Sequence, residues 1–197
     1  MAAIAAKAIY VGGLRIDALS HEAWAELLVE NYRANGGRSA KPKFMTSANG
    51  FVLSLQAQRP EFRRLLDQAD GIDADGMSLV FGSRWWNAQP LPERVATTDF
   101  FHVAARRAAE TGMSFYLLGG SEEDNRAAAE RVQAAYPGLR IAGRRHGYFA
   151  PDDEAGIVAD IVAAGTDLLW VGLGVPLEHE FIVRNCDRLT GVTWIKS

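Results

Sequence analysis

The sequence has one cysteine, no long apolar run and little excess of charge. A single thiol, Cys186, cannot form an internal disulfide, which is typical of a protein in the reducing cytoplasm. No segment has the roughly 20 consecutive apolar residues of a membrane-spanning helix, so any membrane association is expected to be peripheral. The formal net charge of -3 argues against a protein that coats nucleic acid.

What is present is typical of a globular domain. The chain has 197 residues, of which 48% are hydrophobic and 23% charged, enough for one substantial core. Short β-rich runs alternate with helical patterns, which predicts a single-domain α/β fold with a largely parallel sheet. The expected strands are 8–11, 43–47, 114–118, 167–171 and 192–195, with a short one around Ile141. The expected helices are 21–32 with Ser20 as N-cap, 50–58, one after Pro60, 98–111, 122–135, 155–164 and 178–189.

Two segments fit this pattern less well. Residues 69–76 are acidic and glycine-containing, which predicts a turn region before the apolar run 77–81. The apolar strand 192–195 is followed only by Lys196 and Ser197, with nothing evident to cover it. An exposed apolar strand is a liability, so we expect the native sequence to continue beyond Ser197.

Glycine-containing loops follow several of the expected strands. In open parallel sheets ligands bind at the carboxyl ends of the strands, where such loops converge. Gly119 and Gly120 precede a helix and would let phosphate oxygens approach the backbone, but a tight turn without a ligand explains them equally well. The run 172–176 has two glycines of the dinucleotide fingerprint, yet Pro176 and Glu178 follow where the third is expected. A nucleotide-binding oxidoreductase therefore stays open as an alternative.

Three aspartates, Asp70, Asp73 and Asp75, crowd one short segment. Most turn carboxylates are simply exposed, but Asp75 precedes Gly76 and an apolar run, a context that suits a half-buried general base. Metal binding is the rival interpretation, although no histidine lies at a useful spacing, so no metal site is predicted.

Two further residues have two interpretations each. The forked donors of Arg94 match a diphosphate, but a salt bridge to Glu93 or Asp99 is the alternative. His179 could be a general base, although its spacing favours a residue on the helix face.

Taken together, these loops resemble the WecG/TagA/CpsF family of glycosyltransferases. The resemblance rests on motifs that occur in the family's order from about Phe44 to the chain end. The matching stretches are Thr46-Ser47-Ala48-Asn49, Ala74-Asp75-Gly76, Pro92-Glu93-Arg94-Val95, Phe115-Tyr116-Leu117-Leu118-Gly119-Gly120, Tyr136-Pro137-Gly138-Leu139, Gly147-Tyr148-Phe149 and Val171-Gly172-Leu173-Gly174-Val175-Pro176.

The resemblance implies a Rossmann-like glycosyltransferase domain over residues 1–197, without a catalytic metal or cofactor, that inverts the sugar carbon. Asp75 matches the family's proposed base and Arg94 an arginine near the leaving diphosphate. The other implied substrate-binding residues are Ser47 and Asn49 in the pocket, Gly119 and Gly120 at the diphosphate, Tyr148 near the nucleotide base, and Glu178.

The resemblance also implies the substrates and the place of action. The donor is a UDP-sugar and the acceptor a polyprenyl-diphosphate-linked sugar, used in cell-surface polysaccharide synthesis by a peripheral protein at the inner face of the cell membrane. A homo-oligomer is compatible with this family. A non-catalytic binding scaffold is the remaining alternative.

Departures from the family pattern concern the donor sugar and the end of the chain. Glu178 stands in Pro176-Leu177-Glu178-His179, where many relatives read Pro-Lys-Gln-Glu. N-acetylmannosamine is the best-known transferred sugar, whereas the run 193–196 resembles exopolysaccharide members, which implies a hexose. A Gly-rich Phe-Asp segment and a basic C-terminal appendage, usual in the family, are not in this sequence.

Overall fold

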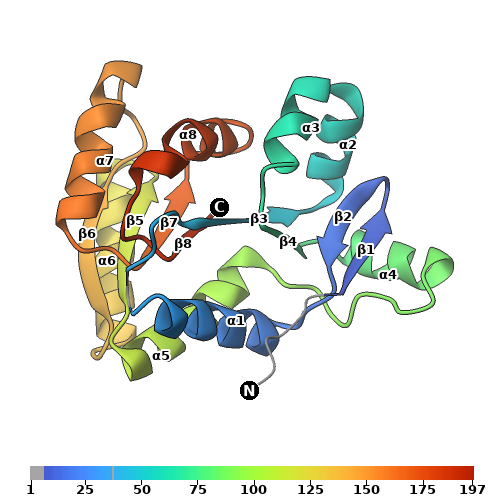
Figure 1. Ribbon diagram of the computed structural model, residues 1–197, viewed down its shortest axis with the longest axis horizontal. Coiled ribbons are helices and arrows are strands. Elements are labelled where there is room, and N and C mark those ends of the chain that lie inside the picture. The colour runs from blue at the N-terminus through green and yellow to red at the C-terminus, as the bar shows by residue number, and fades with distance from the viewer. Residues whose placement is uncertain (1–6, 37) are drawn as a thin grey trace.

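The computed structural model describes residues 7–36 and 38–197. Its centre is a six-stranded sheet in the order β4-β3-β8-β7-β5-β6, in which all neighbours are parallel (Figure 1). The strands are β3 (Lys43–Ala48), β4 (Gly71–Ala74), β5 (Ser114–Gly119), β6 (Arg140–Arg145), β7 (Leu168–Gly172) and β8 (Trp194–Lys196). The predicted α/β class with a parallel sheet is confirmed.

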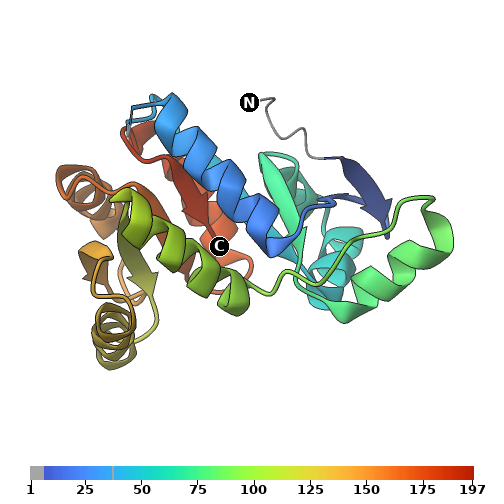
Figure 2. The same cartoon turned by 90° about the horizontal axis from the view of Figure 1, so that it is seen from below.

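Helices cover both faces of this sheet, which explains why its central strands β5 and β7 are apolar along almost their whole length. On one face α1 and α5 lie side by side (Figure 2), where Trp24 of α1 meets Trp194 of β8 edge to face with ring centroids 6.1 Å apart. On the other face α7 and α8 bury Ile157 and Phe181 against β5 and β7. The helices are α1 (His21–Ala34), α2 (Gly50–Gln58), α3 (Pro60–Leu66), α4 (Met77–Trp86), α5 (Thr97–Thr111), α6 (Glu122–Ala135), α7 (Glu154–Ala163) and α8 (Leu177–Asn185).

Local sequence sets several helix ends. Ser20 is the N-cap of α1, as predicted, and its side chain accepts the N–H of Ala23. Pro60 stands in the first turn of α3, where its missing N–H costs nothing. Gly112 ends α5 with φ 78°, a left-handed conformation that favours glycine. In the described parts of the chain, no helix is both long and apolar enough to cross a membrane.

A small hairpin precedes the main sheet. Strand β1 (Ala8–Val11) was predicted, but its partner β2 (Leu14–Asp17) was not. Leu14 and Ile16 are buried against α2, α3 and β4. Asp17 ties the hairpin to the sheet, because its carboxylate accepts the backbone N–H of Ile72 at 2.9 Å.

Two expectations are corrected by the fold. Within the predicted turn region 69–76, residues Gly71–Ala74 form the fully buried strand β4, because they pair along β3. Asp73 is therefore a buried strand residue. The last strand, β8, is not exposed: it lies between β3 and β7 in the middle of the sheet, and its three side chains are buried. The expectation that this strand is exposed was wrong, because the last strand of the sequence is not at the edge of the sheet but has a neighbour on each side.

Candidate functional site

The predicted site residues gather at one edge of the sheet. Because the strands are parallel, their carboxyl ends share that edge. The loops after β3, β4, β5 and β7 begin there with Asn49, Asp75, Gly120 and Leu173. Close packing joins two of them: a Cβ on Gly76 would lie 3.4 Å from Cα of Asn49.

Asp75 is half-buried at this edge and directly contacts Arg94. Its backbone N–H donates to the carbonyl of Ala48 at 2.8 Å, and Val95 donates to the carbonyl of Ala74 at 2.8 Å. These two bonds hold Arg94 beside the aspartate, with Nε 3.5 Å from Oδ1 of Asp75. The sequence pattern did not determine this contact, because it offered Glu93 and Asp99 as partners of Arg94.

The structure shows which of these two carboxylates lies near Arg94. Asp99 lies at the limit of an ion pair, with its Oδ2 4.0 Å from Nη2 of Arg94. Glu93 turns the other way and accepts from the backbone N–H and the ring of His21. Arg94 therefore bridges Asp75 and Asp99, and its side chain remains partly exposed.

The electrostatics of Asp75 favour a proton acceptor. Burial raises the pKa of the Asp75 carboxyl above its ordinary value, while the Arg94 guanidinium and the Lys196 ammonium act against that rise. A carboxylate whose pKa lies above the usual range is a stronger base than an ordinary carboxylate.

Below Asp75 lies a buried polar network that the sequence analysis missed. Lys196 ends β8 and is almost fully buried; its Nζ donates to Oγ of Ser47 at 2.6 Å. The same Nζ lies 3.3 Å from Oδ2 of Asp73. Ser47 also shares a 2.7 Å hydrogen bond with Thr97 of α5. The signal that could have revealed it is a lysine at the carboxyl end of an otherwise apolar strand.

His179 belongs to the core beneath this edge. It is fully buried between the rings of Phe44 and Phe62, and its Nε2 lies 2.9 Å from Oγ1 of Thr46. Burial lowers the pKa of His179 to about 4. The histidine lies on the face of α8 that packs against the sheet, so it does not reach a substrate.

Asn49 and Glu178 both use side-chain oxygens within their own loops. Oδ1 of Asn49 accepts the N–H groups of Phe51 and Val52 and caps α2, which leaves the amide nitrogen for a ligand. Oε2 of Glu178 accepts the N–H of Gly174 at 2.9 Å. A dinucleotide phosphate would need that N–H, so the loop gives no support to an oxidoreductase site.

Gly119 and Gly120 form a turn with left-handed backbone angles. A Cβ on Gly119 would lie 2.2 Å from the carbonyl oxygen of Gly172, so packing between β5 and β7 already requires glycine there. The helix that follows is capped by Ser121 and has three acidic residues in its first turn, which weakens its attraction for an anion.

Two features do adjoin this turn. A hollow of about 260 Å³ beside it includes Phe101, Trp170 and Asn125 in its lining. Tyr148 is 79% exposed, and its loop is fixed to the turn by the bond from the N–H of Gly147 to the carbonyl of Gly120.

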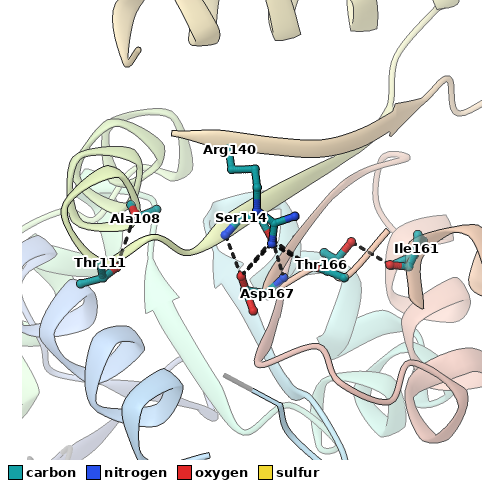
Figure 3. A network of polar contacts seen from close by, with 8 residues as sticks. Ala108, Thr111, Ser114, Arg140, Ile161, Thr166 and Asp167 are labelled. Carbon is teal, nitrogen blue, oxygen red and sulfur yellow. Dashed lines mark hydrogen bonds and ion pairs between the residues drawn. The ribbon is translucent and has the colours of Figure 1, made fainter. Parts of the chain in front are cut away.

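A larger hollow, of about 750 Å³, lies at the opposite edge of the sheet. Its carboxylate already has partners: Oδ2 of Asp167 accepts from the backbone N–H and the hydroxyl of Ser114 at 2.8 and 2.9 Å (Figure 3). Arg140 lies 3.6 Å from the same oxygen and donates to the carbonyl of Gly165. These contacts connect the amino ends of β5 and β7 and occupy the polar groups there. The carboxyl edge of the sheet is therefore the better candidate for the functional site.

Comparison with known proteins identifies the family of the chain. The profile of the family "Glycosyl transferase WecG/TagA/CpsF family" matches residues 9–197. A relative from Bacillus spizizenii, N-acetylglucosaminyldiphosphoundecaprenol N-acetyl-beta-D-mannosaminyltransferase, is 32% identical over 143 residues. The aligned region covers 72% of this chain and 54% of the relative, so the chain spans about half of that protein. The resemblance drawn from the loop motifs is confirmed, and the chain belongs to the WecG/TagA/CpsF family of glycosyl transferases.

Proposed function

We propose that the protein is an inverting glycosyltransferase that passes a sugar from a UDP-sugar to a polyprenyl-diphosphate-linked acceptor at the inner face of the cell membrane. The observation that carries this proposal is the contact of Asp75 with Arg94 at the carboxyl edge of the sheet. It pairs a proton acceptor with a group that binds phosphate. The activity named for the Bacillus spizizenii relative supports a lipid-diphosphate acceptor.

In the proposed reaction an acceptor hydroxyl attacks the anomeric carbon of the donor sugar, on the face opposite the diphosphate. The new carbon–oxygen bond forms as the bond to UDP breaks, and UDP leaves with the electron pair. Asp75 takes the hydroxyl proton, a role worth about 10²- to 10⁴-fold in rate. Arg94 stabilises the negative charge that develops on the leaving diphosphate.

The contact between the two residues also couples donor binding to basicity. In the structure, the Arg94 guanidinium lowers the pKa of Asp75 and so opposes the effect of burial. A bound diphosphate would draw the guanidinium away and add negative charge nearby. The pKa of Asp75 then rises, and the carboxylate becomes a stronger base when the donor is in place.

The remaining predicted residues line the proposed donor path. Ser47 and the amide nitrogen of Asn49 lie beside the loop of Asp75, and we assign them to the transferred sugar. Gly119 and Gly120 would lie along the diphosphate, with Tyr148 and the adjoining hollow toward the base. Glu178 would accept hydrogen bonds from a sugar hydroxyl with its second oxygen. The transferred sugar is N-acetylmannosamine or a hexose, and the proposed chemistry uses no metal or cofactor.

Calorimetry with UDP, UDP-glucose and UDP-N-acetylmannosamine tests donor binding first. UDP release with a polyprenyl-diphosphate-sugar acceptor then tests turnover in the native protein and in Asp75→Asn. Asp99→Asn is the matched control, because Asp99 also faces Arg94 but has no proposed proton to accept. Unchanged turnover in Asp75→Asn would remove the base from the proposal.

Two results would replace the proposal as a whole. Tight binding of NAD or NADP without any response to UDP would favour the oxidoreductase. A protein that binds neither UDP nor a sugar nucleotide would favour the non-catalytic scaffold. The last strand, which was expected to be exposed, is the buried β8 and offers no surface to such a scaffold.

A further inference from the structure

Helix α4 exposes an apolar face although its other face is well buried. Leu79 and Val80 are buried against the hairpin core. On the opposite side Met77, Phe81 and Trp85 recur at a spacing of four residues and therefore share one face. Phe81 is 53% exposed and Trp85 is 81% exposed. The inner face anchors the helix to the hairpin core, whereas the outer aromatics remain exposed.

Neighbouring elements add further exposed apolar side chains near this face. The rings of Trp85 and Trp86 are 5.8 Å apart. A Cβ on Gly82 would lie 3.7 Å from the Trp86 ring and 3.9 Å from Val11 of the hairpin, which places that ring beside β1. We call the exposed apolar side chains of α4 and its immediate surroundings the α4 patch: Tyr10, Phe51, Met77, Phe81, Trp85 and Trp86.

The segment that carries most of this patch has a single charged residue, and the carboxylates Asp75 and Glu93 flank it in the sequence. Residues 77–92 contain one cation, Arg84, and no carboxylate, in a chain whose formal net charge is -3. The Arg84 guanidinium lies 5.7 Å from the centre of the Phe81 ring, so the cation belongs to the patch. Tryptophan, tyrosine and phenylalanine next to a cation are the side chains that favour the interface between lipid headgroups and acyl chains.

The position of α4 relative to the candidate site is equally specific. The helix begins at Met77, and only Gly76 separates it from Asp75. At the start of α2, a Cβ on Gly50 would lie 3.9 Å from the hydroxyl of Ser78, so Phe51 flanks the same corner. Figures 1 and 2 both show α4 at one end of the molecule beside the hairpin, free of the helices that cover the sheet.

We propose that the α4 patch docks the protein onto a lipid bilayer with anionic headgroups. Trp85, Phe81 and Met77 enter the interface, and Arg84 pairs with headgroup phosphates. Asp75 then lies close to the headgroup layer, at the depth where a lipid-linked diphosphate presents its sugar. The consequence for Asp75 rests on the proposed function, whereas the docking itself does not.

Charge argues against a second copy of the chain as the occupant. A symmetric contact through the patch would bring two Arg84 side chains toward each other, with no carboxylate from residues 77–92 to pair with them. An anionic bilayer supplies the missing negative charge at the same depth as the aromatic rings.

The test is flotation with vesicles of phosphatidylglycerol and phosphatidylcholine, compared with phosphatidylcholine alone. We expect the native chain to bind the mixed vesicles and to lose most of that binding at high salt. The double substitution Phe81→Ser, Trp85→Ser is expected to weaken binding at least about tenfold. Arg84→Glu is expected to weaken it on the anionic vesicles, whereas Arg126→Glu on the exposed surface of α6 is the matched control and is expected to change it less.

UDP binding in solution, without vesicles, separates this inference from the proposed function. A native chain that binds UDP but no vesicles would overturn the docking and leave the transferase. Vesicle binding without UDP binding would keep the docking surface and remove the proposed donor. Two further results would overturn the docking. One is vesicle binding by the double variant that equals that of the native chain. The other is a native chain that forms a concentration-dependent dimer and binds no vesicles, when the double substitution abolishes that dimer.

Discussion

The ammonium of Lys196 lies 3.3 Å from a carboxylate oxygen of Asp73, and both side chains are almost fully buried. Lys196 comes from the last strand in sequence and Asp73 from the strand at the sheet edge, with β3 between them. Ser47 of β3 accepts a hydrogen bond from the same ammonium. The floor of the candidate site is therefore an ion pair that spans three strands.

Removal of the lysine should destabilise the fold. Lys196→Met leaves the Asp73 carboxylate buried without its counter-charge, which typically costs about 3–5 kcal/mol. We expect urea denaturation at neutral pH to show this loss, and Asp73→Asn added to Lys196→Met to recover much of it. The control is Lys41→Met, whose partner Asp187 is exposed; it should leave the unfolding midpoint unchanged. Equal effects of the two lysine substitutions would contradict a buried pair.

A second prediction concerns the pH dependence of stability. Burial lowers the pKa of His179 from its ordinary value of 6.5 to about 4. The unfolded chain therefore takes up a proton at a higher pH than the folded protein, so stability falls as pH drops from about 6.5 toward 4. Between pH 7 and 5 this group alone should cost about 2 kcal/mol.

The variant His179→Gln isolates that contribution. Glutamine retains a polar group for Thr46 but cannot titrate. We expect the free energy of unfolding of the variant to fall less between pH 7 and 5 than that of the native protein. His102→Gln, at an exposed position on α5, should retain the native pH slope. An identical slope in His179→Gln would show that the histidine does not titrate as inferred.

The fall of kcat/KM at acidic pH, the acid limb of the pH profile, should reflect the protonation of Asp75. A general base must be deprotonated, so kcat/KM falls as pH drops through its pKa. Because burial raises the pKa of Asp75, we expect this limb above the range of an ordinary carboxyl. Arg94→Gln removes a cation that lowers the pKa and should move the limb further up. A limb that moves down in Arg94→Gln would exclude Asp75 as the group observed.

Local sequence was sufficient where strong signals flank an element. The helix Glu122–Ala135 was predicted with its observed ends, since Ser121 caps its start and Pro137 follows its end. Strands β2 and β4 were missed because each has only four residues and contains an aspartate. Their burial depends on partners distant in sequence, since Asp17 binds the backbone of Ile72 and β4 pairs with β3.

The candidate site likewise has features that the sequence could predict and features that it could not. Parallel strands bring Asn49 and Gly119 to one edge, and this follows from the α/β pattern alone. Asp75 reaches the same edge at the end of β4, a strand that the sequence did not predict. The contact of Asp75 with Arg94 depends on how the segment before α5 returns to β4, which no local signal encodes. The Lys196 network was missed because its strand was taken to be exposed, whereas strand order places it in the centre of the sheet.

The two glycines after β5 should respond differently to the same substitution. In Gly119→Ala the new Cβ would lie 2.2 Å from the carbonyl oxygen of Gly172, at a φ of 143°, so β5 and β7 must separate. We expect a loss of at least about 2 kcal/mol in unfolding free energy. In Gly120→Ala the nearest atom is 3.7 Å away, so only the left-handed backbone is penalised, by about 1 kcal/mol.

Nucleotide binding by the same pair distinguishes packing from recognition. If Gly120 lies along a diphosphate, Gly120→Ala should weaken UDP binding in calorimetry by more than its small effect on stability explains, because a methyl group stands where phosphate oxygens approach the backbone. The control is Gly112→Ala, a left-handed glycine at the end of α5 with no atom within 4 Å of the new Cβ. It carries the same backbone penalty and should leave UDP affinity unchanged. Equal UDP affinity in all three folded proteins would remove Gly120 from the donor site and leave the turn with a packing role alone.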